Sequence, residues 1–181
     1  MKKLSTIYTI GHSTRDLENI LFLLIKNKIE VLVDVRSFPG SRKYPQFNKE
    51  NLEISIPEAG IEYVHFKDLG GRRKVSKDSK NTSWHNVSFR GYADYMETAE
   101  FKNAAEKLME IAETKITCIM CSEAVWWRCH RSMIADYLKN KNWTVIHVLS
   151  SDKLEEHPYT QAAKIINGEL IYGPEKDLFN P

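Results

Sequence analysis

Side chains capable of chemistry are concentrated in residues 118–131 (CIMCSEAVWWRCHR), which include all three cysteines of the chain. Residues 115–120 are short, apolar and bounded by polar residues, a pattern typical of a buried strand. A helix is predicted to begin near Cys129 or His130, because apolar side chains recur at helical spacing from Met133. A connection that only turned the chain would favour Gly, Asn or Pro, and residues 122–128 contain none of these. We therefore expect this connection to carry function.

Two of the cysteines are candidate nucleophiles. Cys121 follows the predicted strand, whereas Cys129 lies at the predicted helix start, where the helix N-terminus and neighbouring arginines favour a thiolate. Either thiol could attack a substrate, with His130 or His12 as the base and Glu123 orienting that base. The competing interpretation is that both thiols only pack, since unpaired cysteines are often buried.

A metal site is an alternative that the spacing does not favour. Cys121, Cys129 and His130 offer soft ligands. No second close cysteine pair exists, as a zinc ribbon would require, and neighbouring residues on a helix point about 100° apart. Cys118 lies within the predicted strand and is expected only to pack.

The first predicted strand, residues 5–10, ends at Gly11-His12-Ser13. Ser13 and Asp16 form a helix start that resembles a capping box. His12 would lie near unpaired backbone N–H groups, where it could transfer a proton or bind an anion. The alternative is a histidine that only stabilises the loop.

The second predicted strand, residues 29–35, is apolar on both faces except for Asp34. Because a buried carboxylate is costly unless paired, Asp34 is expected to form an ion pair with an arginine. Arg36, two residues on, starts on the same face. Asp34 could also act as a base or accept a sugar hydroxyl, while Arg36 or Arg42 clamps a phosphate.

The third predicted strand, residues 61–66, is followed by Gly70-Gly71-Arg72, where backbone could approach an oxyanion. Neither a P-loop nor a G-x-G-x-x-G dinucleotide motif is present. Residues 73–86 are polar and basic, and a connection of this length suggests a mobile loop. Nearby aromatic residues such as Tyr92 and Trp127 could stack on nucleic-acid bases. The alternative is a solvated run of charges with the aromatic residues in the core.

Alternating strands and helices predict the framework that positions these groups. The pattern indicates a single α/β domain over residues 1–181, a three-layer sandwich with a mostly parallel sheet of about five strands. Residues 152–181 are expected to form a C-terminal extension packed on it. In such sheets ligands bind beyond the carboxyl ends of the strands. The remaining predicted strands are 115–120 and 144–149, and predicted helices cover 17–27, 49–58, 89–96, 100–112 and a stretch from about 129.

Charge is unevenly distributed along the chain. Residues 36–50, 64–91 and 121–131 together carry thirteen basic and four acidic side chains, so the net charge of +2 leaves about −7 elsewhere. These segments are the loops expected at the carboxyl ends of the strands. That edge of the sheet should therefore attract an anion.

Composition places the chain among ordinary globular proteins. Its 181 residues suit one domain, and its 42% apolar and 28% charged residues are typical of soluble proteins. No apolar run reaches membrane-spanning length, and no signal-peptide core follows the N-terminus. An odd number of clustered cysteines argues for reduced thiols. A cytoplasmic location without a membrane partner is expected; the oligomeric state is not predicted.

An ordered set of motifs resembles the family known as domain of unknown function 488. The likeness extends from about residue 8 to about residue 172. The family has no agreed reaction, so the resemblance implies only that these strand-end loops form a shared site. The motifs are Gly11-His12-Ser13, Asp34-Val35-Arg36 with Pro39 and Ser41, Leu69-Gly70-Gly71, Phe89-Arg90-Gly91-Tyr92, and Cys121-x-Glu123 through Cys129-His130-Arg131.

The leading hypothesis is an enzyme, a hydrolase or transferase, acting on a phosphate-bearing substrate such as a nucleotide or nucleic-acid component. The cofactor is left open, with a metal possible but not favoured. A thiol phosphatase is disfavoured because Cys121 and Arg128 form C-x6-R, one residue longer than C-x5-R. The alternative is a non-catalytic nucleic-acid or ligand-binding module with structural cysteines. The candidate residues are Cys121, Glu123, His130, His12 and Asp34 for catalysis, and Ser13, Arg36, Arg42, Gly70, Gly71, Arg72, Arg90, Tyr92, Trp127, Cys129 and Arg131 for substrate binding.

Overall fold

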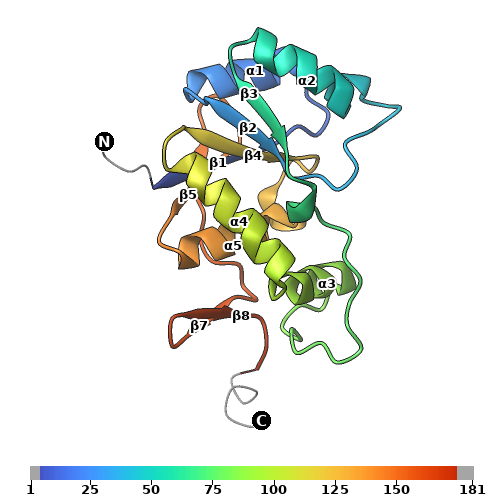
Figure 1. The fold of residues 1–181 in the computed structure, drawn as a ribbon, viewed down its shortest axis with the longest axis vertical. Helices are drawn as coiled ribbons and strands as arrows, with labels where there is room; N and C mark the ends of the chain where they lie inside the picture. Colours follow the sequence, from blue (N-terminus) through green and yellow to red (C-terminus); the bar gives the residue numbers. More distant parts are fainter. Residues whose placement is uncertain (1–4, 175–181) are drawn as a thin grey trace.

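A six-stranded sheet of order β3-β2-β4-β1-β5-β6 lies at the centre of the computed structural model, which describes residues 5–174 (Figure 1). The first five strands pair in parallel and β6 pairs antiparallel with β5. The predicted mostly parallel sheet is confirmed, with one strand more than the five expected. The strands are β1 (Thr6–Gly11), β2 (Val31–Asp34), β3 (Glu62–His65), β4 (Thr117–Cys121), β5 (Thr144–Val148) and β6 (Leu154–Glu156).

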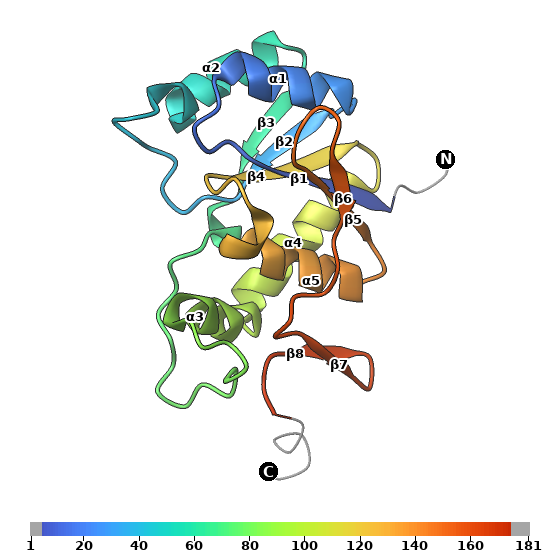
Figure 2. The same cartoon turned by 180° about the vertical axis from the view of Figure 1, so that it is seen from behind.

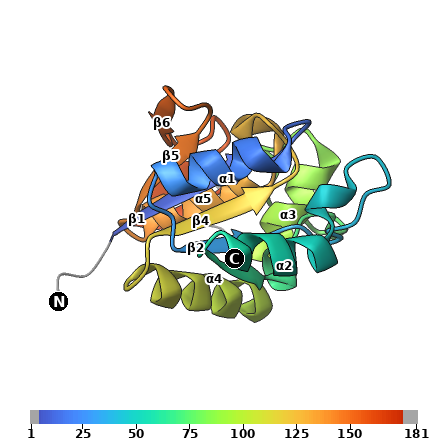
Figure 3. The same ribbon diagram turned by 90° about the horizontal axis from the view of Figure 1, so that it is seen from above.

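Helices cover both faces of the sheet (Figures 1 and 3). Alternate residues of β2 show why: Val31 and Val33 belong to one buried cluster, whereas Leu32 belongs to the other. A strand that is apolar on both faces requires cover on both sides. The predicted three-layer sandwich is therefore confirmed. One face packs against α1 (Leu17–Lys26) and α2 (Lys49–Glu58), and the other against α3 (Val87–Met96), α4 (Ala99–Ala112) and α5 (Arg131–Asn140).

Side-chain caps mark the start of three helices, α1, α3 and α4. Asp16, and not Ser13, caps α1 by accepting a hydrogen bond from the backbone N–H of Asn19. Ser13 instead adopts a left-handed conformation with φ of 47° in the turn before the cap. Asn86 and Thr98 cap α3 and α4 in the same way as Asp16 caps α1. None of the helices within residues 5–174 has the length and apolar character needed to cross a membrane.

The segment after β5 runs along the edge of the sheet and then under α5 (Figure 2). It contains β6 and a hairpin of β7 (Lys164–Ile166) and β8 (Glu169–Ile171). Three of its residues, His157, Thr160 and Tyr172, donate hydrogen bonds to the buried carboxylate of Asp136 on α5. These bonds hold this part of the predicted extension against the domain; residues 175–181 lie outside the described residues.

Candidate functional site

The carboxyl ends of β1, β2 and β4 lie side by side because β4 is inserted between the other two. Gly11 is in register with Cys121, and Asp34 with Met120. Backbone hydrogen bonding continues past the strands, since the N–H of His12 donates to the carbonyl of Cys121 over 3.0 Å. A side chain at Gly11 would collide with the backbone of Glu123, so glycine permits this close approach.

A hollow of about 690 Å³ opens at this edge, a size suited to a small molecule. Four strand-end loops and the N-terminal half of α3 form its wall. Ten of the predicted site residues line it: His12, Ser13, Arg36, Gly71, Arg72, Tyr92, Cys121, Glu123, Cys129 and His130.

The thiols of Cys121 and Cys129 are close enough to influence each other's ionisation, and both residues line the hollow. Both are buried, and Cys129 is 5% exposed. Burial raises the pKa of Cys121 well above its usual value. Burial also opposes ionisation of Cys129, but the interaction with Cys121 and the charge of Arg131 outweigh it and lower the pKa of Cys129. Cys129 is therefore the more acidic member of the pair.

Arg131 lies behind the thiols with only 1% of its surface exposed. It donates from Nη1 to the Cys121 sulfur over 2.8 Å, and from its two Nη atoms to the carbonyls of Glu123 and Ala124. Its Nε has no partner, and no carboxylate within residues 5–174 forms an ion pair with it. A buried cation is costly unless an anion offsets it. The acidic groups it contacts are thiols, so this environment favours a thiolate.

His130 connects the thiol pair to β2. Its Nε2–H donates to the carbonyl of Val35 over 2.9 Å, which leaves Nδ1 as an acceptor 3.6 Å from the Cys129 sulfur. Burial lowers the pKa of His130, so the imidazole is neutral and can accept the thiol hydrogen. Gly71 packs against this ring, and a Cβ there would lie 3.0 Å from Nδ1. The predicted glycine pair thus accommodates a histidine at Gly71.

Arg36 forms the predicted ion pair with Asp34. Asp34 is fully buried, and its oxygens accept from the Arg36 guanidinium, the Arg36 backbone and the Tyr63 hydroxyl. Other Arg36 N–H groups donate to the carbonyl of Phe47 and to His12. Four of the five side-chain N–H groups of Arg36 are therefore used. Arg36 lines the hollow and Asp34 does not, so the carboxylate orients the guanidinium from behind.

His12 has partners at both ring nitrogens. Nδ1–H donates to the carbonyl of Ser13 over 3.1 Å, and Nε2 lies 3.2 Å from Nη1 of Arg36, where it accepts. Its ring also stacks on Phe47. Burial, followed by the charge of Arg36, lowers the pKa of His12 to about 4. In this arrangement His12 is a neutral acceptor that helps to hold Arg36.

The upper wall of the hollow combines cations with aromatic rings. Arg72 has a left-handed backbone with φ of 58°, and its guanidinium lies 5.9 Å from the ring centroid of Phe38. Tyr92 contacts His130 edge to face and donates its hydroxyl hydrogen to the carbonyl of Leu69. Several other residues that line the hollow were not predicted to bind substrate: Arg128, Ser122, Asn86, Ser88, Phe89 and Tyr44. The positive charge of the 121–131 segment was a signal that could have identified Arg128.

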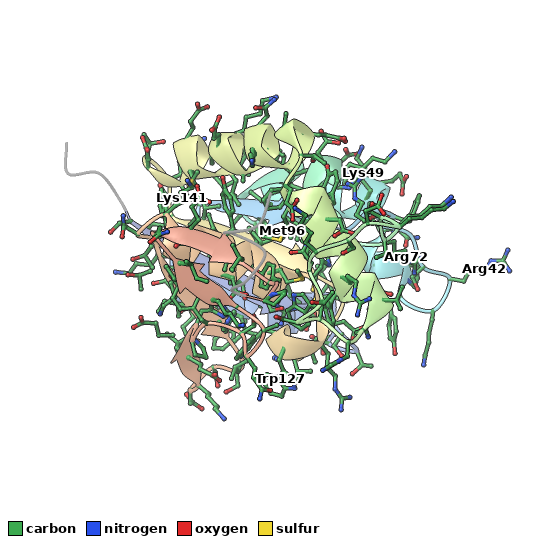
Figure 4. All side chains as sticks on the ribbon, turned by 90° about the horizontal axis from the view of Figure 1, so that it is seen from below. Arg42, Lys49, Arg72, Met96, Trp127 and Lys141 are labelled. Atoms are coloured by element: carbon green, nitrogen blue, oxygen red, sulfur yellow. The ribbon has the colours of Figure 1, made fainter. Side chains whose placement is uncertain are left out.

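Several predicted binding residues do not line the hollow. Arg42 extends away from the body of the protein at the tip of its loop (Figure 4). Trp127 is 51% exposed on another side of the protein and packs against Trp126 (Figure 4). Arg90 donates from Nε to the carbonyl of Trp84, and Gly70 packs against Ser37. These residues lie in or next to segments that border the hollow, but only the tertiary structure determines which way each side chain points.

The basic loop over residues 73–86 is attached to α3. The carboxylate of Asp94 accepts from the backbone N–H of Ser76, the hydroxyl of Ser79 and the amide of Asn81. The guanidinium of Arg73 lies 3.6 Å from the ring centroid of Tyr95. These contacts give the loop a defined path, and its mobility stays a prediction.

The metal alternative finds no matching arrangement in the part of the chain that the structure describes. Within residues 5–174, no group of three or more His, Cys, Asp or Glu side chains is placed to hold a metal ion, and this applies to Cys121, Cys129 and His130. The hydrogen bond from His130 to Val35 occupies the Nε2 of this histidine.

Fold and site together define a three-layer α/β protein with a thiol-bearing hollow at the carboxyl ends of its parallel strands. The model of the family described as Domain of unknown function DUF488 matches residues 16–138. This match covers more than half of the chain and includes the Cys121–Arg131 connection, so the protein belongs to the DUF488 family. No curated protein matches the sequence.

Proposed function

We propose that this protein is an enzyme that binds a phosphate-bearing substrate in the hollow and uses Cys129 as its nucleophile. The observation that carries the proposal is the contact between the thiol site and Arg131, a buried cation that donates to the Cys121 sulfur and has no carboxylate partner among residues 5–174. A site that only needed to pack two cysteines would have no use for a charge in this position. An ionisable nucleophile explains it.

The walls of the hollow support an anionic substrate. Arg36 is oriented by Asp34 and His12 and retains one N–H on Nη1, while Arg72 and Arg128 add two further cations. Phosphate oxygens suit guanidinium donors because one group can make two parallel hydrogen bonds. The neighbouring rings of Phe38 and Phe89 offer surfaces for a nucleotide base. A nucleotide or nucleic-acid component fits both features.

The proposed chemistry is nucleophilic group transfer. The Cys129 sulfur attacks an electrophilic centre of the bound substrate, and a bond to sulfur forms as the bond to the leaving group breaks. His130 accepts the thiol proton at Nδ1, while the backbone N–H of Arg131 and the thiol of Cys121 stabilise the thiolate. Water would complete a hydrolysis and a second substrate would complete a transfer. Glu123 lines the hollow and is the proposed base that activates that acceptor.

The experiment that tests the nucleophile is iodoacetamide labelling of the native protein across pH, followed by peptide mapping. We expect Cys129 to label with a midpoint below the ordinary thiol value of about 8.5. Nucleotides that occupy the hollow should slow this labelling. Cys118→Ser is the matched control, because this thiol is fully buried and lies outside the hollow. A Cys129 that labels only above the ordinary value would refute the proposed nucleophile.

The anion site is tested by measuring nucleotide affinity at several salt concentrations. Arg72→Ala and Arg128→Ala should each weaken binding by roughly 5- to 50-fold, the loss of one charged hydrogen bond. Arg42→Ala should leave affinity unchanged, because this side chain points away from the hollow. Equal losses in all three variants would indicate a diffuse electrostatic effect and no built site.

One observation favours a second candidate, a binding module without catalysis. Cys121 and Cys129 are both almost fully buried, as cysteines that only pack would be. A binding module would retain nucleotide affinity in Cys129→Ser and would show no turnover in the unmodified protein. An enzyme would lose turnover in Cys129→Ser while retaining affinity.

A further inference from the structure

The Cys121–Cys129 pair has a second chemical capability beyond nucleophilic attack on a substrate. The two thiols come from different elements, one from the end of β4 and the other from the extended residue between the short helix Trp126–Arg128 and α5. Their side chains nevertheless interact, and both residues line the hollow. The Cys121 sulfur accepts from Arg131 over 2.8 Å, and the Cys129 sulfur lies 3.6 Å from Nδ1 of His130. Two thiols held together where a small oxidant can enter are arranged for disulfide formation.

We propose that Cys121 and Cys129 form a reversible disulfide when a hydroperoxide enters the hollow, which switches off the thiol chemistry of the site. In the first step the Cys129 thiolate attacks the peroxide, giving a sulfenic acid and releasing water or an alcohol once the leaving oxygen takes a proton. In the second step the Cys121 thiol attacks this sulfenic sulfur, and a second water leaves as the S–S bond forms. Sulfur loses two electrons and the peroxide O–O bond gains them.

The neighbours assign the two roles. Nδ1 of His130 lies 3.6 Å from the Cys129 sulfur and can accept its proton, so Cys129 is the thiol that reacts first. The sulfur of Cys121 accepts a hydrogen bond from the Arg131 side chain, and Cys121 is the thiol that resolves the sulfenic acid. Cys118 is excluded because it is fully buried among the residues that pack under α1 and α2, on the far face of the sheet.

Arg131 also makes the disulfide easy to reduce. Oxidation removes the acidic thiols whose charge offsets this buried cation, whereas reduction restores them. An environment that stabilises the reduced, ionised form raises the reduction potential of a disulfide. The bond is therefore suited to a switch and unsuited to a permanent cross-link.

The test treats the native protein with hydrogen peroxide, blocks free thiols and maps the peptides by mass spectrometry. We expect a linked Cys121–Cys129 peptide that dithiothreitol removes, with Cys118 recovered as a free thiol. Cys118→Ser should give the same linkage. Cys121→Ser should instead accumulate a sulfenic acid at Cys129 that dimedone traps, because no resolving thiol remains.

Wild-type mapping alone is decisive if a variant fails to fold. Recovery of both thiols unlinked after peroxide, or linkage through Cys118, would overturn the proposal. Disulfide formation requires no substrate, so it succeeds or fails independently of nucleotide binding and turnover. If nucleotides fail to protect Cys129 from iodoacetamide, the proposed function is refuted, whereas the proposed disulfide is not affected.

Discussion

Helix α5 carries two buried charges with opposite kinds of environment. Asp136 accepts four hydrogen bonds, from the ring of His157, the backbone and hydroxyl of Thr160, and the hydroxyl of Tyr172. Arg131, five residues earlier, has an unpartnered Nε and no ion-pair partner within residues 5–174. A satisfied buried charge holds a structure together, whereas an unsatisfied one indicates a site where ionisation has a use.

The Asp136 cluster extends as a chain of hydrogen bonds to β1. Nδ1 of His157 lies 2.9 Å from Nε2 of His147. Nδ1 of His147 in turn lies 2.6 Å from the hydroxyl oxygen of Thr9. Because His157 donates Nε2–H to Asp136, its Nδ1 accepts from His147, and His147 then accepts from Thr9. Every member is satisfied while both rings are neutral. This chain fastens the segment after β5 to the sheet and contributes no group to the hollow.

The largest expected effect is on stability at Asp136. Asp136→Ala leaves four buried donors without an acceptor, so the free energy of unfolding in urea should fall by about 3–5 kcal/mol. Arg131→Met should cost less, because it also removes a buried charge that no carboxylate offsets. A larger loss of unfolding free energy in Arg131→Met than in Asp136→Ala would contradict a structural role for Asp136 and a functional role for Arg131.

The next effect is on thiol reactivity. Arg131→Met removes the cation that contacts the thiol pair, so the iodoacetamide labelling midpoint of Cys129 should rise by roughly 1–3 pH units. Arg131→Lys, which retains the charge, should recover part of this shift. Asp136→Asn serves as the comparison on the same helix and should leave the midpoint in place. An unchanged midpoint in Arg131→Met would remove Arg131 from the proposed site.

The smallest effect is the pH dependence of folding. Burial, followed by the charge of His157, lowers the pKa of His147 to about 2, and the pKa of His12 is about 4. The unfolded chain binds these protons near pH 6.5, so stability is fully present above that pH and is lost as pH falls from 6.5 toward 4. Urea unfolding should show a slope of roughly 1 kcal/mol per pH unit for each histidine in that window.

A matched pair of variants identifies the residues responsible for that slope. His147→Gln should reduce the slope by about half, because glutamine cannot be protonated and His12 still contributes, although the variant itself will be less stable. His85→Gln should leave the slope unchanged, because this histidine is exposed and lies outside both clusters. Equal slopes in the wild type and His147→Gln would show that the cluster does not control acid sensitivity.

Sequence reasoning could find the convergence of loops because parallel strands place their carboxyl ends on one edge. It could not find the Asp136 cluster, since His157 and Tyr172 are distant in sequence from α5 and carry no local pattern. Asp136 gave one usable signal, a carboxylate on the apolar face of a helix, which must be paired. Its partners depended on the path of the segment after β5.

The sequence by itself determined the α/β architecture, the helix and strand order, and the grouping of cysteines, histidines and arginines at one edge, because hydrophobic periodicity and strand polarity are local properties. Only the tertiary structure decided which of these groups meet. Arg42 and Trp127 point away, Asp34 lies behind Arg36, and Arg131 lies beneath the two thiols. Side-chain direction and burial depend on packing between distant segments, which no local pattern in the sequence encodes.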